Sequence, residues 1–356
     1  KKNTQKQASL CYKKLSMSKK NSNVILKNYF KDFKELHEIY LKFKTKLKNF
    51  KKKTFVVAVS GGPDSLALVA LTKSLNYEYK TKFFYVLINH NIRKKSSQEA
   101  IKVKKLLFKK KINLNIISNQ QPIKKNIQSE ARNIRYNLLL KFCKKKKINN
   151  LITAHNLEDQ VETFFIRLSR GSGLTGLSSM RPIYKIKPSI NLHRPLLDIK
   201  KVFLIKISRL IFGKFISDPT NSDNKFLRPK IRNLKKPLEA SGIEYTQIVK
   251  SINHLASSKE TLEEYFTKEY KNVVQISRNN LIIIDMIRFK KLNQEMKIKV
   301  INASIKKLKN NYYNPRSKKV INLINKLENK AGNKFTLGGC IFIKNREKLT
   351  LSKERP

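Results

Sequence analysis

Residues 55–65 read FVVAVSGGPDS, and this stretch decides the fold. A run of β-branched and aromatic residues predicts a buried strand, and Ser60–Ser65 predicts a tight turn into a helix. Two glycines let backbone N–H groups turn toward one anion, Pro63 suits the first helical turn, and the helix N-terminus adds partial positive charge. The pattern predicts a phosphate-binding loop. The alternative is an ordinary Ser/Gly turn that caps a helix.

Short β-branched or aromatic runs alternate with longer helical patterns on the C-terminal side of this loop. We expect strands at FFYVLIN, INLNII and NLITA, and helices after Pro63, over 96–111 and over 128–147. Such repeats build an α/β domain, a parallel sheet with helices on both faces, whose ligands bind beyond the carboxyl ends of the strands. The loop lacks the lysine of a Walker A motif, which argues against a kinase or a GTPase.

The last third of the chain has a different pattern. After about residue 226 apolar residues recur at helical spacing, and KFTLGGCIFIKNREKLTLS alternates around Lys344–Glu347, which predicts a terminal hairpin. We therefore expect an N-terminal extension with a leading helix over 1–52, a catalytic domain over 53–225, a helical domain over 226–310 and a small α+β domain over 311–356.

The charge is strongly positive. Lys and Arg number 79 against 24 Asp and Glu, a formal net charge of +55. A field of this size attracts polyanions such as nucleic acid. Lys, Asn, Ile, Phe and Tyr are all frequent, so the base composition of an AT-rich genome is the alternative explanation for the excess. The charge supports an RNA partner without proving one.

Cysteines and apolar runs suggest where the protein works. Cys11, Cys143 and Cys340 are too far apart for a CxxC pair or a zinc motif, and too few for a disulfide framework, which favours a reducing compartment. No apolar run approaches the length of a membrane span. We expect a cytoplasmic protein with no membrane partner. The sequence does not determine the oligomeric state, and a homodimer is one option.

Several side chains after the loop can carry chemistry. Asp159 and Glu162 are three residues apart on a predicted helix, so their carboxylates share one face and could hold an ammonium. The alternative is a solvated acidic face. His155 ends a predicted strand at the ligand-binding edge. Arg132 and Arg135 lie three apart on another helix, where they could grip phosphate or be a solvated pair.

The loop resembles the SGGxDS motif of the PP-loop ATP pyrophosphatases, which transfer AMP from ATP to a substrate oxygen. Further stretches resemble the tRNA(Ile)-lysidine synthase family, in the same order along the chain. They are Asn89–Arg93 (NHNIR), Glu130–Tyr136 (EARNIRY), Ala154–Thr163 (AHNLEDQVET) running into Arg170–Leu174 (RGSGL), and Arg194–Leu197 (RPLL) with Asp218–Asn221 (DPTN), Arg228 and Arg232. The resemblance covers about residues 53–235 well and the remainder weakly.

This resemblance implies an enzyme that spends ATP to join free L-lysine to the wobble cytidine of an isoleucine tRNA with a CAU anticodon. It implies that the loop binds ATP, that Asp64 contacts magnesium, and that Asp159 and Glu162 hold the lysine amine. It implies that the remaining site residues contact the nucleotide, the wobble base or the tRNA. The implied sets are Asp64, Asp159 and Arg132 for catalysis, Ser60, Gly61, Gly62, Pro63, Asp64 and Ser65 for ATP, and His155, Asp159, Glu162, Arg135, Arg170, Arg194, Arg228 and Arg232 for substrates.

The chain departs from the family pattern at two positions. Glu158 replaces an expected aspartate and keeps a carboxylate, whereas Pro229 replaces an expected asparagine and could alter a backbone contact near tRNA. A glycine cluster at Gly171, Gly173 and Gly176 implies either a close approach to a ligand or a plain interdomain turn. Two other functions are alternatives, a PP-loop tRNA thiolase and an RNA-binding protein with a decayed ATP site. The isolated cysteines argue against the first, and the intact loop argues against the second.

Overall fold

The computed structural model describes most of the chain. The described residues are 26–29, 31–50, 53–79, 81–92, 95–121, 123, 127–216, 227–277, 281–309, 315–329 and 333–354. Most of the predicted N-terminal extension, Arg93 and Asp218–Asn221 lie outside them. Contacts divide the chain into two units, residues 1–256 and residues 257–356.

A six-stranded sheet forms the centre of the first unit, with strand order β3-β2-β1-β4-β6-β5. Its strands are β1 (Thr54–Val59), β2 (Lys82–Asn89), β3 (Leu114–Ser118), β4 (Asn150–Ile152), β5 (Ile183–Lys187) and β6 (Ile190–His193). The pairs from β3 to β6 are parallel, as predicted, but β5 pairs with β6 antiparallel. The sheet is therefore mixed, with an antiparallel edge strand that the sequence pattern did not reveal.

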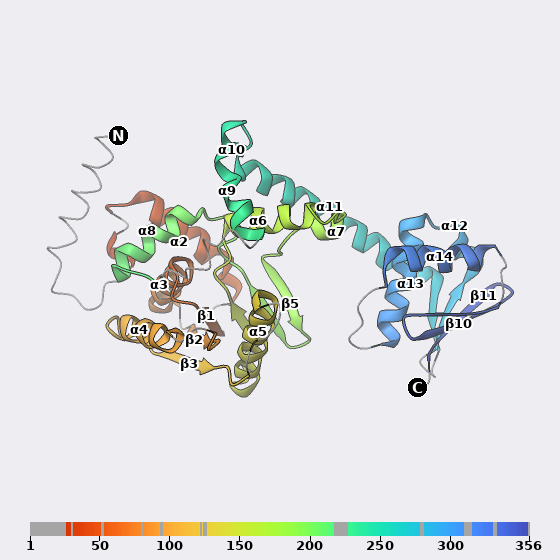
Figure 1. The fold of residues 1–356 in the computed structure, drawn as a ribbon, viewed down its shortest axis with the longest axis horizontal. Helices are drawn as coiled ribbons and strands as arrows, with labels where there is room; N and C mark the ends of the chain where they lie inside the picture. The colour runs from red at the N-terminus through yellow and green to blue at the C-terminus, as the bar shows by residue number, and fades with distance from the viewer. Residues whose placement is uncertain are drawn as a thin grey trace. The chain divides into compact units, whose positions relative to one another are not determined.

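Helices cover both faces of this sheet (Figure 1). Side chains of β1 alternate between two cores: Phe55, Val57 and Val59 face one, and Val56 faces the other. Burial on both sides is typical of a parallel sheet covered by helices. The first core takes side chains from α2 (Lys34–Lys46), α3 (Pro63–Glu78), α4 (Ser96–Phe108) and α8 (Lys201–Phe212), and the second takes them from α5 (Ile127–Lys145).

A third cluster joins the later helices of the first unit to α6. The cluster takes side chains from α6 (Leu157–Leu168), α10 (Lys235–Ala240) and the start of α11 (Tyr245–Val273), while α7 (Leu174–Leu177) and α9 (Leu227–Asn233) contact α6 beside it. Leu157 and Val161 of α6 pack against Ile248 and Ile252 of α11. Two short 3-10 helices, Leu26–Tyr29 and Lys48–Phe50, complete the unit.

The second unit is an α+β fold with a five-stranded antiparallel sheet of order β7-β8-β11-β10-β9. Its elements after α11 are β7 (Val274–Ile276), β8 (Ile282–Asp285), α12 (Met286–Lys291), α13 (Gln294–Leu308), α14 (Ser317–Glu328), β9 (Lys334–Leu337), β10 (Cys340–Asn345) and β11 (Lys348–Lys353). The predicted terminal hairpin is present as β10 and β11, with its turn at Arg346 and Glu347.

The division after residue 256 differs from the boundaries expected at 225 and 310. Two strands from before residue 310 join three strands from after it in one sheet, so residues 311–356 do not complete a core alone. Helices α9 and α10 lie in the first unit, because α9 packs on α6 and Leu238 of α10 joins the same cluster. The division depends on contacts between segments that are distant in sequence. The local residue pattern therefore carries no signal for it near residue 225 or residue 310.

Among the described residues, no helix combines the length and the apolar character that a membrane crossing requires.

Replacing Phe342 with alanine should lower the free energy of unfolding of the second unit by about 3–5 kcal/mol, because the fully buried ring would leave a cavity. Ile343→Ala is the matched control. Ile343 is the next residue on the same strand and is 46% exposed, so its truncation should change the free energy by less than about 0.5 kcal/mol. Denaturant unfolding of the full chain, followed by circular dichroism, measures both. Equal losses would contradict a core centred on Phe342.

Candidate active site

The loop Ser60–Ser65 connects β1 to α3 and is held by its own last residue. Ser65 Oγ accepts hydrogen bonds from the N–H groups of Ser60 and Gly61, each at 3.1 Å, and donates to the carbonyl of Gly62 at 3.0 Å. Gly62 is the N-cap of α3 and makes no side-chain cap, and Pro63 occupies the first turn. The N-cap residue of α3 therefore has no side chain to bind the N–H groups of the first turn, and such groups are the kind that bind anions.

Gly61 is required by both its backbone angle and its surroundings. Its φ of +85° lies in the left-handed region, and a Cβ atom there would lie 2.5 Å from Cγ2 of Val103 on α4. Its carbonyl accepts a hydrogen bond from the N–H of Ile216, after α8, at 3.0 Å. The loop thus lies between α4 and the segment that follows α8, which are distant in sequence.

Asp64 lies in the first turn of α3, and its carboxylate faces Lys201 of α8. Its side chain is 25% exposed, its Oδ2 lies 3.9 Å from Nζ of Lys201, and its Oδ1 is buried with no hydrogen-bond partner within the described part of the chain. Burial raises the pKa of Asp64 to about 6, the Lys201 ammonium opposes this rise, and the Asp159 carboxylate adds to it. Asp64 and Asp159 therefore lie within electrostatic reach of each other.

Helix α6 begins beside the loop with a capping box. Asn156 accepts a hydrogen bond from the N–H of Asp159 at 2.9 Å, and the Asp159 carboxylate accepts from the N–H of Asn156 at 3.1 Å. Both contacts fix the orientation of Asp159. The cap follows β4 directly, so the carboxyl ends of β1 and β4 bring Asp64 and Asp159 together.

His155 lies between β4 and this cap. Its Nδ1 is 2.9 Å from Oγ1 of Thr153. The pKa of His155 is lowered to about 3, mainly by desolvation; the Asp159 carboxylate opposes this fall, and the positive charges of Arg194, Arg132 and Arg135 add smaller lowering effects. The imidazole is therefore neutral near pH 7 and can serve as a hydrogen-bonding group.

Glu162 does not face solvent beside Asp159. Its carboxylate is 2% exposed and forms a two-point ion pair with Arg232 of α9, at 2.5 Å to Nε and 3.2 Å to Nη2. Burial raises the pKa of Glu162, and Arg232 opposes that rise. Glu162 and Arg232 were each predicted from the sequence to bind substrate, and in the structure they bind each other.

Several predicted arginines gather near His155, and one does not. Arg132, Arg135 and Arg194 all act on the pKa of His155, and Arg228 acts on that of Glu162. Arg194 donates to the carbonyl of Arg181 at 2.9 Å. Arg170 is exposed beyond the C-terminal end of α6, roughly 16 Å along the helix from Asp159 at 1.5 Å per residue.

The glycine cluster forms a turn that the side chains of α6 anchor. Nη1 of Arg167 donates to the carbonyl of Gly176 at 2.6 Å, and Gln160 exchanges two hydrogen bonds with the backbone of Met180, each at 2.9 Å. A Cβ on Gly176 would lie 2.5 Å from Cβ of Ser172. Close packing of the turn on itself explains this glycine.

Sequence reasoning did not identify Lys201 or the second role of Glu158. Glu158 Oε2 accepts a hydrogen bond from the N–H of Lys201 at 2.8 Å, which ties the start of α8 to the start of α6. No local motif signals these contacts, because they depend on how α6, α8 and α3 are arranged. In the sequence, Glu158 stood out only because it replaces an aspartate that the family pattern leads one to expect.

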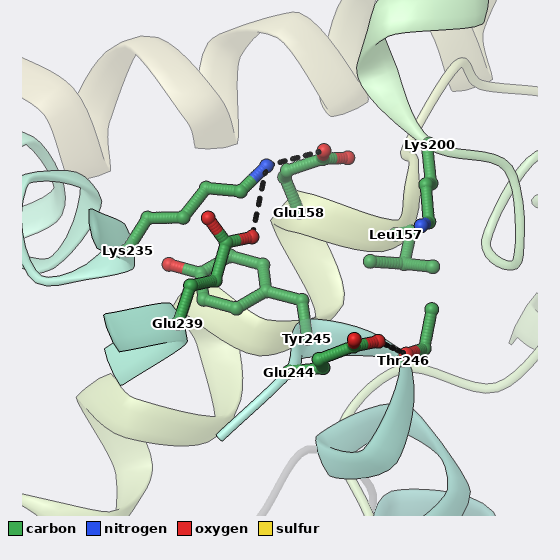
Figure 2. Close-up of a pocket in the computed structure, with 8 residues that line it drawn as sticks. All are labelled: Leu157, Glu158, Lys200, Lys235, Glu239, Glu244, Tyr245 and Thr246. Atoms are coloured by element: carbon green, nitrogen blue, oxygen red, sulfur yellow. Dashed lines mark hydrogen bonds and ion pairs between the residues drawn. The ribbon is translucent and has the colours of Figure 1, made fainter. Parts of the chain in front are cut away.

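A pocket of about 230 Å³ lies on the Glu158 side of α6 (Figure 2). Nζ of Lys235 lies 3.4 Å from Oε1 of Glu158 and 3.9 Å from Oε1 of Glu239, and 5.2 Å from the centre of the Tyr245 ring. The pocket thus surrounds an ammonium of the chain itself with carboxylates and an aromatic face. Its lining residues are Leu157, Glu158, Lys200, Lys235, Glu239, Glu244, Tyr245 and Thr246.

The chain is similar to known proteins both in sequence and in fold. A family model described as a PP-loop domain matches residues 35–238. A tRNA(Ile)-lysidine synthase of Wolbachia pipientis wMel is 34% identical over 307 residues, which cover 84% of this chain and 70% of the relative. One of Rickettsia bellii is 28% identical over 329 residues, which cover 89% and 74%.

One solved structure shows the same fold. It is the U34-tRNA thiolase NcsA from Methanococcus maripaludis with its [4Fe-4S] cluster, at a TM-score of 0.54 and 17% identity, covering 62% of this chain and 78% of that one. In this chain Cys143 lies on α5 in the first unit and Cys340 on β10 in the second, and both are buried.

Replacing Gly61 with alanine should cost about 1–3 kcal/mol of folding stability, because the new Cβ meets Val103 and the left-handed backbone is strained. Gly62→Ala is the matched control, since the nearest atoms to its Cβ lie at 3.7 Å or beyond. Thermal unfolding of both variants measures the difference. Equal midpoints would contradict the close packing of the loop against α4.

Replacing Asp64 with asparagine should stabilise the protein more at high pH than at low pH. The folded pKa of about 6 exceeds the unfolded value of 3.8, so wild-type stability falls as pH rises through this window and Asp64 ionises. The gain in midpoint temperature of Asp64→Asn over wild type should therefore be larger at pH about 8 than at pH about 4. A gain that does not change with pH would show that burial does not raise this pKa.

Proposed function

The chain belongs to the tRNA(Ile)-lysidine synthase family of PP-loop enzymes, and we propose that its active site joins L-lysine to carbon 2 of the wobble cytidine in a CAU-anticodon isoleucine tRNA. It is a ligase that uses ATP to form lysidine in tRNA. The change of the wobble base would switch the tRNA from the methionine codon to an isoleucine codon.

The observation that best supports this proposal is the convergence of the loop and the start of α6. Asp64 opens the helix after the loop, Asp159 caps α6, and their charges interact. A phosphate-binding helix N-terminus therefore lies beside a carboxylate that can hold an ammonium. A site that activates a base with ATP and then delivers an amine to it needs both groups within one cavity.

In the first step, the backbone N–H groups at the start of α3 bind the phosphates of ATP. The carbonyl oxygen on carbon 2 of cytidine attacks the α-phosphate, an oxygen–phosphorus bond forms, and pyrophosphate leaves. The product is an adenylated base. Cations near the loop stabilise the charge that develops on the phosphates.

Asp64 is the residue that would hold magnesium. Its orphaned, buried Oδ1 is an oxygen ligand of the kind that this cation prefers, and the cation commonly takes its remaining ligands from phosphate and water. In the described ranges no group of three His, Cys, Asp or Glu side chains is placed to hold a metal ion. When bound, magnesium would neutralise phosphate charge.

In the second step, Asp159 binds the ε-ammonium of lysine and accepts a proton from it. The free amine attacks carbon 2, a nitrogen–carbon bond forms, and AMP leaves with the former carbonyl oxygen. The sequence also placed Glu162 on the amine, but its carboxylate is neutralised by Arg232. Direct binding by Glu162 would require that pair to open, so we assign the first contact with lysine to Asp159.

The remaining residues provide contacts to the nucleotide and to RNA. We propose that neutral His155 hydrogen-bonds the nucleotide or the wobble base, and that Arg132, Arg135, Arg194 and Arg228 bind phosphate around it. Arg232 fixes Glu162 at the edge of this group. Arg170, at the far end of α6, would contact tRNA away from the reacting base.

Recognition of the whole tRNA should involve the residues after about 226. Isoleucine and methionine tRNAs share the CAU anticodon, so discrimination requires contacts elsewhere on the molecule. We propose that the chain after about residue 226, which includes the whole second unit, contacts the tRNA outside the anticodon by shape and backbone. A homodimer and a cytoplasmic location stay predictions.

Replacing Asp159 with asparagine should lower lysine transfer about 100-fold or more, because the amine loses its counter-charge and its proton acceptor. Adenylation of the base should fall much less, since ATP binds at the loop. Two assays separate the steps: pyrophosphate release from ATP in the presence of tRNA, and incorporation of radiolabelled lysine into the same tRNA.

Asp198→Asn is the matched control for this change. Asp198 is an exposed aspartate of the same unit that pairs with Lys46, and its replacement should leave both steps unchanged. Equal losses of adenylation and of lysine transfer in Asp159→Asn would move Asp159 from lysine to the nucleotide.

A further inference from the structure

The phosphate-binding loop has no cation of its own. Ser60–Ser65 contains no lysine or arginine, although the reaction releases pyrophosphate, which carries several negative charges. Loops of the Walker type place a lysine on the terminal phosphates for this purpose. Backbone N–H groups alone supply only partial charges. A fixed cation from elsewhere in the fold would complete the site.

Lys201 reaches the loop from another helix. It is the first residue of α8, and its Nζ lies 3.9 Å from Oδ2 of Asp64. Helix α8 packs along α3, and Leu204 and Ile207 join the same core as Leu66. The side chain of Lys201 is 35% exposed, so its ammonium borders both the loop and solvent.

The start of α8 is fixed by α6. The N–H of Lys201 donates to Oε2 of Glu158 at 2.8 Å, and the N–H of Leu157 donates to the carbonyl of Ile199 at 3.1 Å. The Glu158 carboxylate is 13% exposed, and its other oxygen pairs with Lys235. Two backbone contacts thus hold the helix that carries Lys201 against the helix that carries Asp159.

We propose that Lys201 binds the β- and γ-phosphates of ATP and stabilises the departing pyrophosphate, with Glu158 as the positioning residue that fixes the start of α8. This inference rests on the proposed binding of ATP at Ser60–Ser65. The pair with Asp64 is long and partly exposed, and such pairs are weak, so exchanging the carboxylate for phosphate costs little. Lys201 supplies from α8 the charge that the loop lacks.

The test compares ligands that differ only in their phosphates. In the full chain, Lys201→Met should weaken binding of ATP about 10- to 100-fold, the usual range for a lost charged hydrogen bond. Binding of AMP should stay unchanged, because AMP has no β- or γ-phosphate. Lys201→Arg should retain most of the ATP affinity. Isothermal titration calorimetry with ATP and with AMP measures both.

Lys206→Met is the matched control for this test. Lys206 lies on the same helix and pairs with Glu35 at 3.0 Å. Its replacement removes the same charge at a position away from the loop. Its ATP affinity should equal that of the wild type. Equal weakening of ATP and AMP in Lys201→Met, or no weakening of either, would overturn the inference. Failure of the wild type to bind ATP would instead contradict the proposed function.

A second pair of variants tests Glu158. Glu158→Gln keeps a carbonyl oxygen that can accept from the N–H of Lys201, whereas Glu158→Ala does not. We expect the alanine variant to lose several-fold in ATP affinity with AMP affinity unchanged, and the glutamine variant to remain close to wild type. If both variants lost the same affinity, the effect would belong to the Lys235 pair, and the positioning role of Glu158 would be wrong.

Discussion

The parallel pairing of β1 with β4 is the constraint on which the rest of the site depends. Only two residue pairs define it, Val56 with Leu151 and Val57 with Ile152, because β4 is three residues long. Both strands end at the same edge of the sheet, so the loop after β1 and the cap of α6 after β4 must lie together. A shift of register would separate Asp64 from Asp159.

Charge balance is the second constraint on the site. In a chain with a net charge of +55, three acids of the site each lie near a cation that comes from a different helix. Asp64 faces Lys201 of α8, Glu162 binds Arg232 of α9, and Glu158 binds Lys235 of α10. Asp159 is the exception, because its carboxylate caps its own helix. In the described part of the chain its carboxylate is thus held by a backbone N–H and not by one of these three cations.

Local patterns predicted much of this structure, and tertiary contacts explain what they missed. The loop, the strand–helix order and the terminal hairpin follow from residue spacing and turn chemistry, which act over a few residues. The antiparallel β5, the sheet shared by β8 and β11, and the pairs of Glu162 with Arg232 and Asp64 with Lys201 join distant segments. Arg232 was predicted as a substrate contact, but its partner depends on how α9 packs on α6.

We propose above all that one active site activates a tRNA base with ATP and then delivers lysine to it. The most direct measurement is the identity of the wobble nucleoside after incubation of unmodified CAU-anticodon isoleucine tRNA with the protein, ATP, magnesium and isotope-labelled lysine. Nuclease digestion and mass spectrometry should find intact labelled lysine on the former cytidine, with one AMP formed for each lysine transferred. An unmodified cytidine, or a wobble base that carries no lysine while AMP accumulates, would contradict the claim.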